Sequence, residues 1–172
     1  MKGTQSSTHK KVILRKLDSG TVKGFVNPNS YLGPNGVELM DLEGHRVAVP
    51  LEEVKGVYFV REFEGNQERQ ERKIFLSRPK LNGLWIRMTF KDAEVLDGLI
   101  SQNLLTLEPQ GYLVTPPDIY SNNLRIFVPR SALAALEVLG VISNGARRGN
   151  LSSRRTEGRS RAASRQMGLF PS

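Results

Sequence analysis

A pattern of apolar strands, a tight polar turn and a glycine occurs twice along this chain. Residues 12–26 place apolar residues on both sides of a polar turn, and Gly24 follows that turn. Residues 85–100 do the same around a second polar turn, with Gly98 in the position of Gly24. Apolar runs of this length that flank a short polar turn are typical of β-hairpins. The repetition predicts a tandem duplication of one small β unit.

The ends of the two units match as well. Val49-Pro50 in the first unit corresponds to Val128-Pro129 in the second, and an apolar run follows each pair. The alanines and leucines after Pro129 favour a helical turn, whereas residues 57–60 have the β-branched and aromatic composition of a strand. We therefore expect one 3₁₀ or α turn and then a closing strand in each unit.

The repeated pattern predicts an all-β protein made of two tandem small five-stranded barrels. A strand that bends sharply to serve two sides of such a barrel needs a residue without Cβ at the corner, which Gly24 and Gly98 supply. The expected organisation is a flexible leader (residues 1–9), a first β-barrel repeat (10–62), a charged connector able to carry an edge strand at residues 74–76 (63–83), a second β-barrel repeat (84–142) and a disordered Arg-rich tail (143–172).

The same residues resemble the Sm-like barrels, the family of the Lsm and Hfq proteins. Residues 17–24 and 36–41 resemble the first block of that family, residues 90–98 resemble a second copy of it, and residues 49–60 and 128–141 stand where its second block would be. SH3-like barrels share much of this pattern. The resemblance implies a small five-stranded barrel in each unit.

The resemblance assigns no RNA-binding residue. The Asp-x-x-x-Asn pair of the family's first block does not follow Gly24 or Gly98, and the Lys-His pair of the Hfq second block is missing. The uridine-binding residues of the family are therefore not transferred to this chain. Residues 104–118 and 122–130 also resemble uncharacterised bacterial proteins of similar length, a likeness that implies no function.

Positive charge is concentrated near the C-terminus. The formal net charge is +8, yet residues 1–143 carry 18 basic and 16 acidic groups. Residues 144–172 contain one acid, Glu157, and seven arginines, which are Arg147, Arg148, Arg154, Arg155, Arg159, Arg161 and Arg165. So polar a segment cannot bury enough apolar surface to offset its ordering entropy, and we expect it to be disordered.

The arginines of this tail suit phosphate backbones, because each phosphate that they neutralise releases a counterion. We therefore expect sequence-independent contact with nucleic acid, and a merely solubilising tail is the alternative. An anionic membrane surface fits less well, since no apolar face accompanies the charge.

The last residues of the chain depart from the polar character of the tail. Gln166, Met167, Leu169 and Phe170 place large apolar side chains next to a glutamine. The pentapeptide resembles the bacterial sliding-clamp-binding motif Gln-Leu-x-Leu-Phe, with Met in place of the first Leu. The resemblance implies that Gln166 is a polar anchor, Met167 a secondary contact, and Leu169 and Phe170 the residues that fill a hydrophobic pocket. An ordinary terminus, or a strand that folds back onto the barrels, is the alternative.

Nothing in the sequence indicates catalysis, a metal or a cofactor. The chain has no cysteine, which excludes a disulfide framework and thiolate metal sites and fits the reducing cytoplasm. His9 lies in the polar leader and His45 in a turn, and neither has a carboxylate or a second histidine at ligand spacing. Phosphate-binding glycine loops, Gly-x-Ser-x-Gly motifs and apolar runs of membrane-spanning length are also missing. The sequence predicts a cytoplasmic protein that is not an enzyme.

The leading interpretation is a non-enzymatic adaptor. In it the barrels are a scaffold, the basic tail contacts nucleic acid, and the terminal peptide docks on the sliding clamp, so that weak contacts act together through avidity. One alternative is an Sm-like protein whose barrels bind RNA or form oligomers by self-association through barrel edge strands. A protein-interaction module that binds no nucleic acid is the other alternative.

Overall fold

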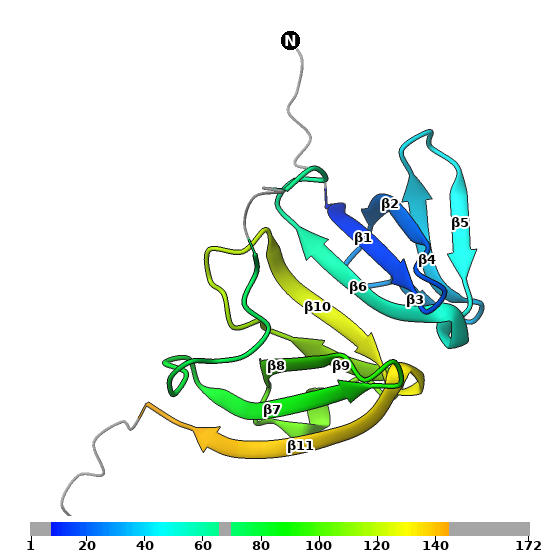
Figure 1. Ribbon diagram of the computed structural model, residues 1–172. Coiled ribbons are helices and arrows are strands. Elements are labelled where there is room, and N and C mark those ends of the chain that lie inside the picture. The colour runs from blue at the N-terminus through cyan, green and yellow to red at the C-terminus, as the bar shows by residue number, and fades with distance from the viewer. Residues whose placement is uncertain (1–7, 66–69, 145–172) are drawn as a thin grey trace, which may run out of the picture.

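The computed structural model describes residues 8–65 and 70–144, and these residues form an all-β protein (Figure 1). The first half contains β1 (Lys10–Lys16), β2 (Thr21–Val26), β3 (Leu32–Gly33), β4 (Gly36–Asp41), β5 (Arg46–Val49) and β6 (Val54–Val60). The second half contains β7 (Gly83–Phe90), β8 (Val95–Ile100), β9 (Gly111–Val114), β10 (Asn123–Pro129) and β11 (Leu133–Ile142). Three 3₁₀ turns complete the fold, η1 (Leu51–Glu53), η2 (Leu104–Thr106) and η3 (Arg130–Ala132).

The strands form two antiparallel sheets, and neither sheet closes on itself within the described residues. An eight-stranded sheet has the order β3-β4-β2-β1-β6-β10-β9, with β5 paired to β4, and a three-stranded sheet has the order β11-β7-β8. A single bridge, Leu99 to Thr115, links β8 to the residue after β9. The expected all-β class is therefore confirmed, but the expected arrangement of two tandem five-stranded barrels is not, because neither sheet closes and β6 pairs with β10 of the other half.

The strand pairing repeats between the two halves. In the first half the order is β6-β1-β2-β4-β5, and in the second it is β11-β7-β8, the bridge, then β9-β10. The register repeats too: Leu14 lies opposite Val57 as Met88 lies opposite Leu136. The two hairpins expected from the sequence are confirmed, and so is the single 3₁₀ turn that follows each Val-Pro pair.

Equivalent turns explain why these hairpins form at these positions. Ser19 and Ala93 adopt positive φ angles of 72° and 65°. The side chain of Asp18 accepts a hydrogen bond from the Gly20 N–H at 2.9 Å, and Asp92 stabilises the second turn in the same way. An Asp side chain that binds the backbone two residues on is a common turn device. The two turns therefore have the same local chemistry.

Gly24 and Gly98 lie where the second strand of each half approaches the third. A Cβ added to Gly24 would stand 2.3 Å from the Met40 carbonyl oxygen, and one added to Gly98 would stand 2.0 Å from Val114 Cγ1. No side chain fits at these separations, so glycine is required by close approach.

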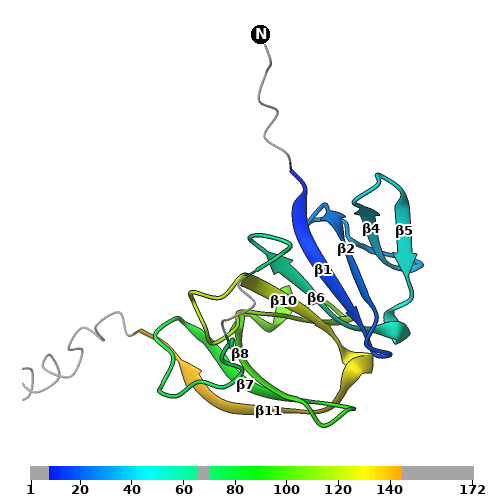
Figure 2. The same cartoon turned by 45° about the horizontal axis from the view of Figure 1, so that its top comes forward.

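The antiparallel pair β6–β10, which we call the joint, lies between the two halves and contributes to both hydrophobic cores (Figures 1 and 2). Phe127, on β10 of the second half, is fully buried in the first core and makes an edge-to-face contact with Tyr31, with the ring centroids 5.6 Å apart. Tyr58 and Val60, on β6 of the first half, are buried in the second core. Each core is thus incomplete without a strand from the other half.

Asp97 is one of the residues that attach the connector to the second half. This carboxylate is fully buried and receives two hydrogen bonds from the Arg87 guanidinium, at 2.7 and 3.0 Å. Its backbone N–H donates to the Lys73 carbonyl at 2.7 Å. Residues 74–76, where an edge strand was expected, are not in a strand, because the Phe75 N–H turns toward the Asp97 side chain instead of a neighbouring backbone.

We predict that Gly24→Ala destabilises both halves together. The added methyl group collides with the backbone of β4, and overpacking of this kind costs roughly 1 to 3 kcal/mol. Trp85, the only tryptophan, lies on β7 in the second half, so its fluorescence reports on the half that is not mutated. In urea, the midpoints measured by Trp85 fluorescence and by circular dichroism should fall by the same amount.

Gly140→Ala is the matched control, because the nearest atom to its added Cβ lies 3.9 Å away. A Trp85 signal that keeps its wild-type midpoint in Gly24→Ala would show that the halves unfold separately, contrary to the shared cores.

Candidate functional site

All site residues predicted from the sequence lie outside the described residues. This holds for the nucleic-acid-binding arginines Arg147, Arg148, Arg154, Arg155, Arg159, Arg161 and Arg165 and for the partner peptide Gln166, Met167, Leu169 and Phe170. The described chain ends at Asn144, whose N–H donates to the Asn82 side chain and whose amide donates to the Lys80 carbonyl, each at 2.6 Å. The connector therefore fixes the point from which the Arg-rich segment continues.

The joint is reinforced by a cluster of charges from both halves. Lys55 of β6 makes ion pairs with Asp92 and with Glu94 in the β7–β8 turn, and Lys73 of the connector pairs with Glu94 at 2.8 Å. The Lys55 side chain is only 12% exposed and its ammonium also lies 5.1 Å from the centroid of the Phe90 ring. This cluster ties the hairpin of the second half to the last strand of the first.

The ionisation of the cluster follows from these contacts. The hydrogen bond from Lys55 lowers the pKa of Asp92 below its ordinary 3.8. Burial opposes the charge of Glu94, but hydrogen bonds from Lys55 and Lys73 outweigh it and lower its pKa below 4.5. Burial likewise opposes the charge of Lys55, and its two carboxylate partners outweigh it and raise its pKa. All three groups are therefore held in their charged forms.

A groove of about 880 Å³ runs across the joint and is a candidate ligand site. Its apolar lining includes Tyr31, Phe59 and Leu113, and its basic lining includes the exposed Lys10 and Arg125. Such a lining can hold an apolar or aromatic group next to a negative charge. The sequence gives no signal for this groove, because its lining comes from strands of both halves.

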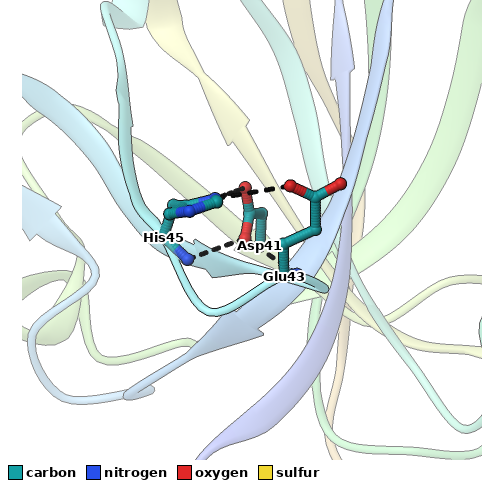
Figure 3. A group of neighbouring side chains, drawn as sticks. All are labelled: Asp41, Glu43 and His45. Carbon is teal, nitrogen blue, oxygen red and sulfur yellow. Dashed lines mark hydrogen bonds and ion pairs between the residues drawn. The ribbon is translucent and has the colours of Figure 1, made fainter.

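A second cluster lies in the β4–β5 turn, where Asp41, Glu43 and His45 converge (Figure 3). The expectation that His45 has no carboxylate at ligand distance is wrong, because the turn brings its Nδ1 within 3.4 Å of Asp41 and 3.5 Å of Glu43. Asp41 also accepts the N–H groups of His45 and Glu43, which lower its pKa. Glu43 and His45 are largely exposed, so the arrangement is explained as a capped turn.

The structure adds two unpaired sheet edges that no residue motif reveals. Among the described strands, β5 pairs only with β4 and β11 pairs only with β7. Figures 1 and 2 show these two strands on the outer sides of the molecule, with the joint between them. Unpaired edges present backbone N–H and C=O groups to any strand that can pair with them.

Replacing Lys55 by Met should remove a stabilisation that depends on pH. The carboxylates of Asp92 and Glu94 have lowered pKa values in the folded protein, so the stability that they provide is present above about pH 4.5 and is lost as the pH falls through the folded values. Lys55→Met should therefore lower the free energy of unfolding by about 1 kcal/mol at neutral pH and by less near pH 3. Urea denaturation at both pH values measures this difference.

Lys16→Met, which removes an ion pair with the half-exposed Glu53, is the matched control and should cost less at neutral pH. A wild-type advantage over Lys55→Met that is the same at both pH values would contradict an electrostatic origin.

No helix in residues 8–65 or 70–144 has both the length and the apolar character needed to cross a bilayer.

Comparison with known proteins adds one assignment. No curated protein and no solved structure gives a significant match to the chain. Residues 8–140 match a family model, and this match covers both repeats, the joint and the connector. The chain therefore belongs to the family described as Family of unknown function (DUF6982).

Proposed function

We propose that the protein is a non-enzymatic cytoplasmic adaptor, in which the two β repeats are a rigid scaffold and residues 144–172 bind nucleic acid. The observation that carries this proposal is the separation of charge. The last 29 residues carry a net charge of +6, and the preceding 143 carry +2. Contact with phosphate backbones is the function that best fits an Arg-rich segment attached to a nearly neutral scaffold.

The ion pairs of the scaffold support this division of roles. Several of its basic groups are engaged with acids of the same chain, as in the pairs Lys11–Glu62, Lys16–Glu53, Lys73–Glu94 and Arg87–Asp97. Residues 147–165 contain seven arginines and a single acid. A polyanion is therefore attracted mainly to the C-terminal segment.

We also propose that each half is an open form of the small five-stranded barrel found in Sm-like and SH3-like proteins. The support is that each half has five main strands in the same order, with a bent second strand next to a glycine and a 3₁₀ turn before the fifth strand. In this proposal β6 contributes to the barrel of the second half and β10 contributes to the barrel of the first. This sharing explains why neither sheet closes on itself within the described residues.

The terminal peptide adds a second contact in this proposal. Gln166 binds the rim of a pocket on the sliding clamp, and Leu169 and Phe170 fill the pocket. Weak phosphate contacts by the neighbouring arginines raise the local concentration of the peptide near a clamp on DNA, so that the two contacts act together.

Replacing all seven arginines of the segment by Gln should abolish binding to DNA without changing the melting temperature. The physical reason is that the substitution removes the charge while leaving the scaffold residues unchanged. Fluorescence anisotropy with a labelled duplex at low salt measures the binding. If all seven arginines contact phosphates, log K should fall with log salt with a slope of about −6.

The matched control replaces the same seven arginines by Lys, which keeps the charge and should keep most of the salt-dependent affinity. Undiminished binding by the Gln variant would refute the assignment of nucleic-acid contact to this segment.

Substitution of Leu169 and Phe170 by Ala should abolish recovery of the protein on immobilised sliding clamp, because these side chains fill the pocket in the proposed complex. Ser172→Ala is the control, since Ser172 lies outside the motif and should leave recovery unchanged. Equal recovery of the wild type and the double variant would exclude clamp docking through this peptide, while leaving the nucleic-acid proposal to its own test.

A further inference from the structure

The joint is a pairing of strands between the two repeats of one chain. When the two-residue strand β3 is left out of the count, β6 is the fifth strand of the first half and β10 is the fourth strand of the second. The joint is therefore a contact between the fifth strand of one repeat and the fourth strand of the next. The remaining fourth and fifth strands are β5 and β11, and each of them pairs with one neighbour only among the described residues.

The pairing register shows which residues of β5 and β11 are equivalent to which residues of β10 and β6. Val47 of β5 lies opposite Leu39 as Ile126 of β10 lies opposite Val114. Likewise, Glu137 of β11 lies opposite Arg87 as Tyr58 of β6 lies opposite Ile13. Within the joint, Ile126 pairs with Tyr58 and Phe127 pairs with Val57. The same pairing applied to the outer strands places Val47 opposite Glu137 and Ala48 opposite Leu136.

We propose that the protein self-associates head to tail, with β5 of one chain paired antiparallel to β11 of a second copy in the register of the joint. The contact is heterologous, so a rotation that closes gives a ring and one that does not close gives a linear chain. The proposal is independent of the nucleic-acid function proposed above, because every residue that carries it lies in the described scaffold.

The exposure of apolar side chains on β11 indicates that this strand lacks a neighbouring strand. Phe59 and Val60 on β6, which pair with Arg125 and Asn123 of β10, are 8% and 5% exposed. Their equivalents on β11 are Val138 and Leu139, which are 57% and 41% exposed. This strand of ten residues has large exposed apolar side chains and contains no Lys or Pro, two residues that commonly protect a free edge, although its register shifts at Leu133/Ala135 and Val138/Gly140. A second copy of β5 would cover it as β10 covers β6.

The backbone of β5 is also free to accept a partner strand. The Asp41 N–H donates to the His45 carbonyl at 2.9 Å, which makes these residues a hydrogen-bonded pair. Hydrogen-bonded and non-hydrogen-bonded pairs alternate in an antiparallel ladder, so the N–H of Val47 faces β4 and the N–H of Ala48 faces the open edge. Ala48 is exposed, and a proline there removes only the outward donor.

Two variants of the full-length chain block the two edges separately. Ala48→Pro blocks β5, and Val138→Lys places a charge on β11 at a position that is solvent-exposed within one chain but buried in the proposed contact. Ala48→Thr and Val138→Thr are the matched controls. Sedimentation velocity over a range of protein concentrations measures the mass, and circular dichroism with thermal melting verifies that each variant is folded.

We expect the wild type and both Thr controls to form multimers, as a discrete ring or as a concentration-dependent series, and both blocking variants to be folded monomers. Mixing the two blocking variants should restore a dimer and nothing larger, because one intact β5 and one intact β11 remain in the mixture. This outcome supports head-to-tail pairing through these two edges.

Three results would overturn the proposal. The first is a wild type that stays monomeric at all concentrations. The second is a multimer that folded Ala48→Pro and Val138→Lys proteins still form, which would place the contact elsewhere. The third is a pair of monomeric variants that do not combine when mixed, because head-to-tail pairing requires the intact β11 of Ala48→Pro to bind the intact β5 of Val138→Lys.

Discussion

The pairing of β6 with β10, through which each half contributes side chains to the core of the other, is the interaction on which the rest of the structure depends. Phe127 is fully buried in the core of the half that does not contain it, and Tyr58 and Val60 are buried in the opposite core. Burying an aromatic side chain contributes roughly 1.5 to 3 kcal/mol, so neither half retains a complete core alone. Lys55 and its carboxylate partners then fix the hairpin of the second half against the joint.

The same interaction organises the outer surfaces of the molecule. Because β6 and β10 pair with each other, their equivalents in the other half, β11 and β5, are each left with one unpaired edge among the described residues. The groove over the joint exists for the same reason, since its lining residues Phe59 and Arg125 come from the two strands of the joint. Asn144 fixes the exit of the Arg-rich segment at the end of β11, next to one of these edges.

The local features of the fold follow from the sequence, and the long-range ones do not. The local elements depend on residues that lie close together in the chain. They are the hairpins, the turns at Ser19 and Ala93 and the 3₁₀ turns after Pro50 and Pro129, and the repeat with its aligned glycines allows them to be predicted. Which strand pairs with β6 depends on contacts between distant residues, and strand alternation alone does not specify a partner.

The candidate sites divide in the same way. Arginine content and a short peptide motif are visible in the sequence, and they lie in the segment beyond Asn144. The groove, the Lys55 cluster and the convergence of Asp41 with His45 require the folded backbone to bring residues together. Only the last could have been anticipated, because alternate residues of one tight turn share a side.

Duplication within one chain has a consequence for how the contacts can diverge. In an assembly of single repeats every interface is encoded by the same residues, so each substitution alters all of them. Here the inner contact has Phe127 where the outer edge has Ala48, and Tyr58 where the outer edge has Glu137. The fusion separates the permanent contact at the joint from the outer edges, so that selection can alter the residues of the outer edges without weakening the fold.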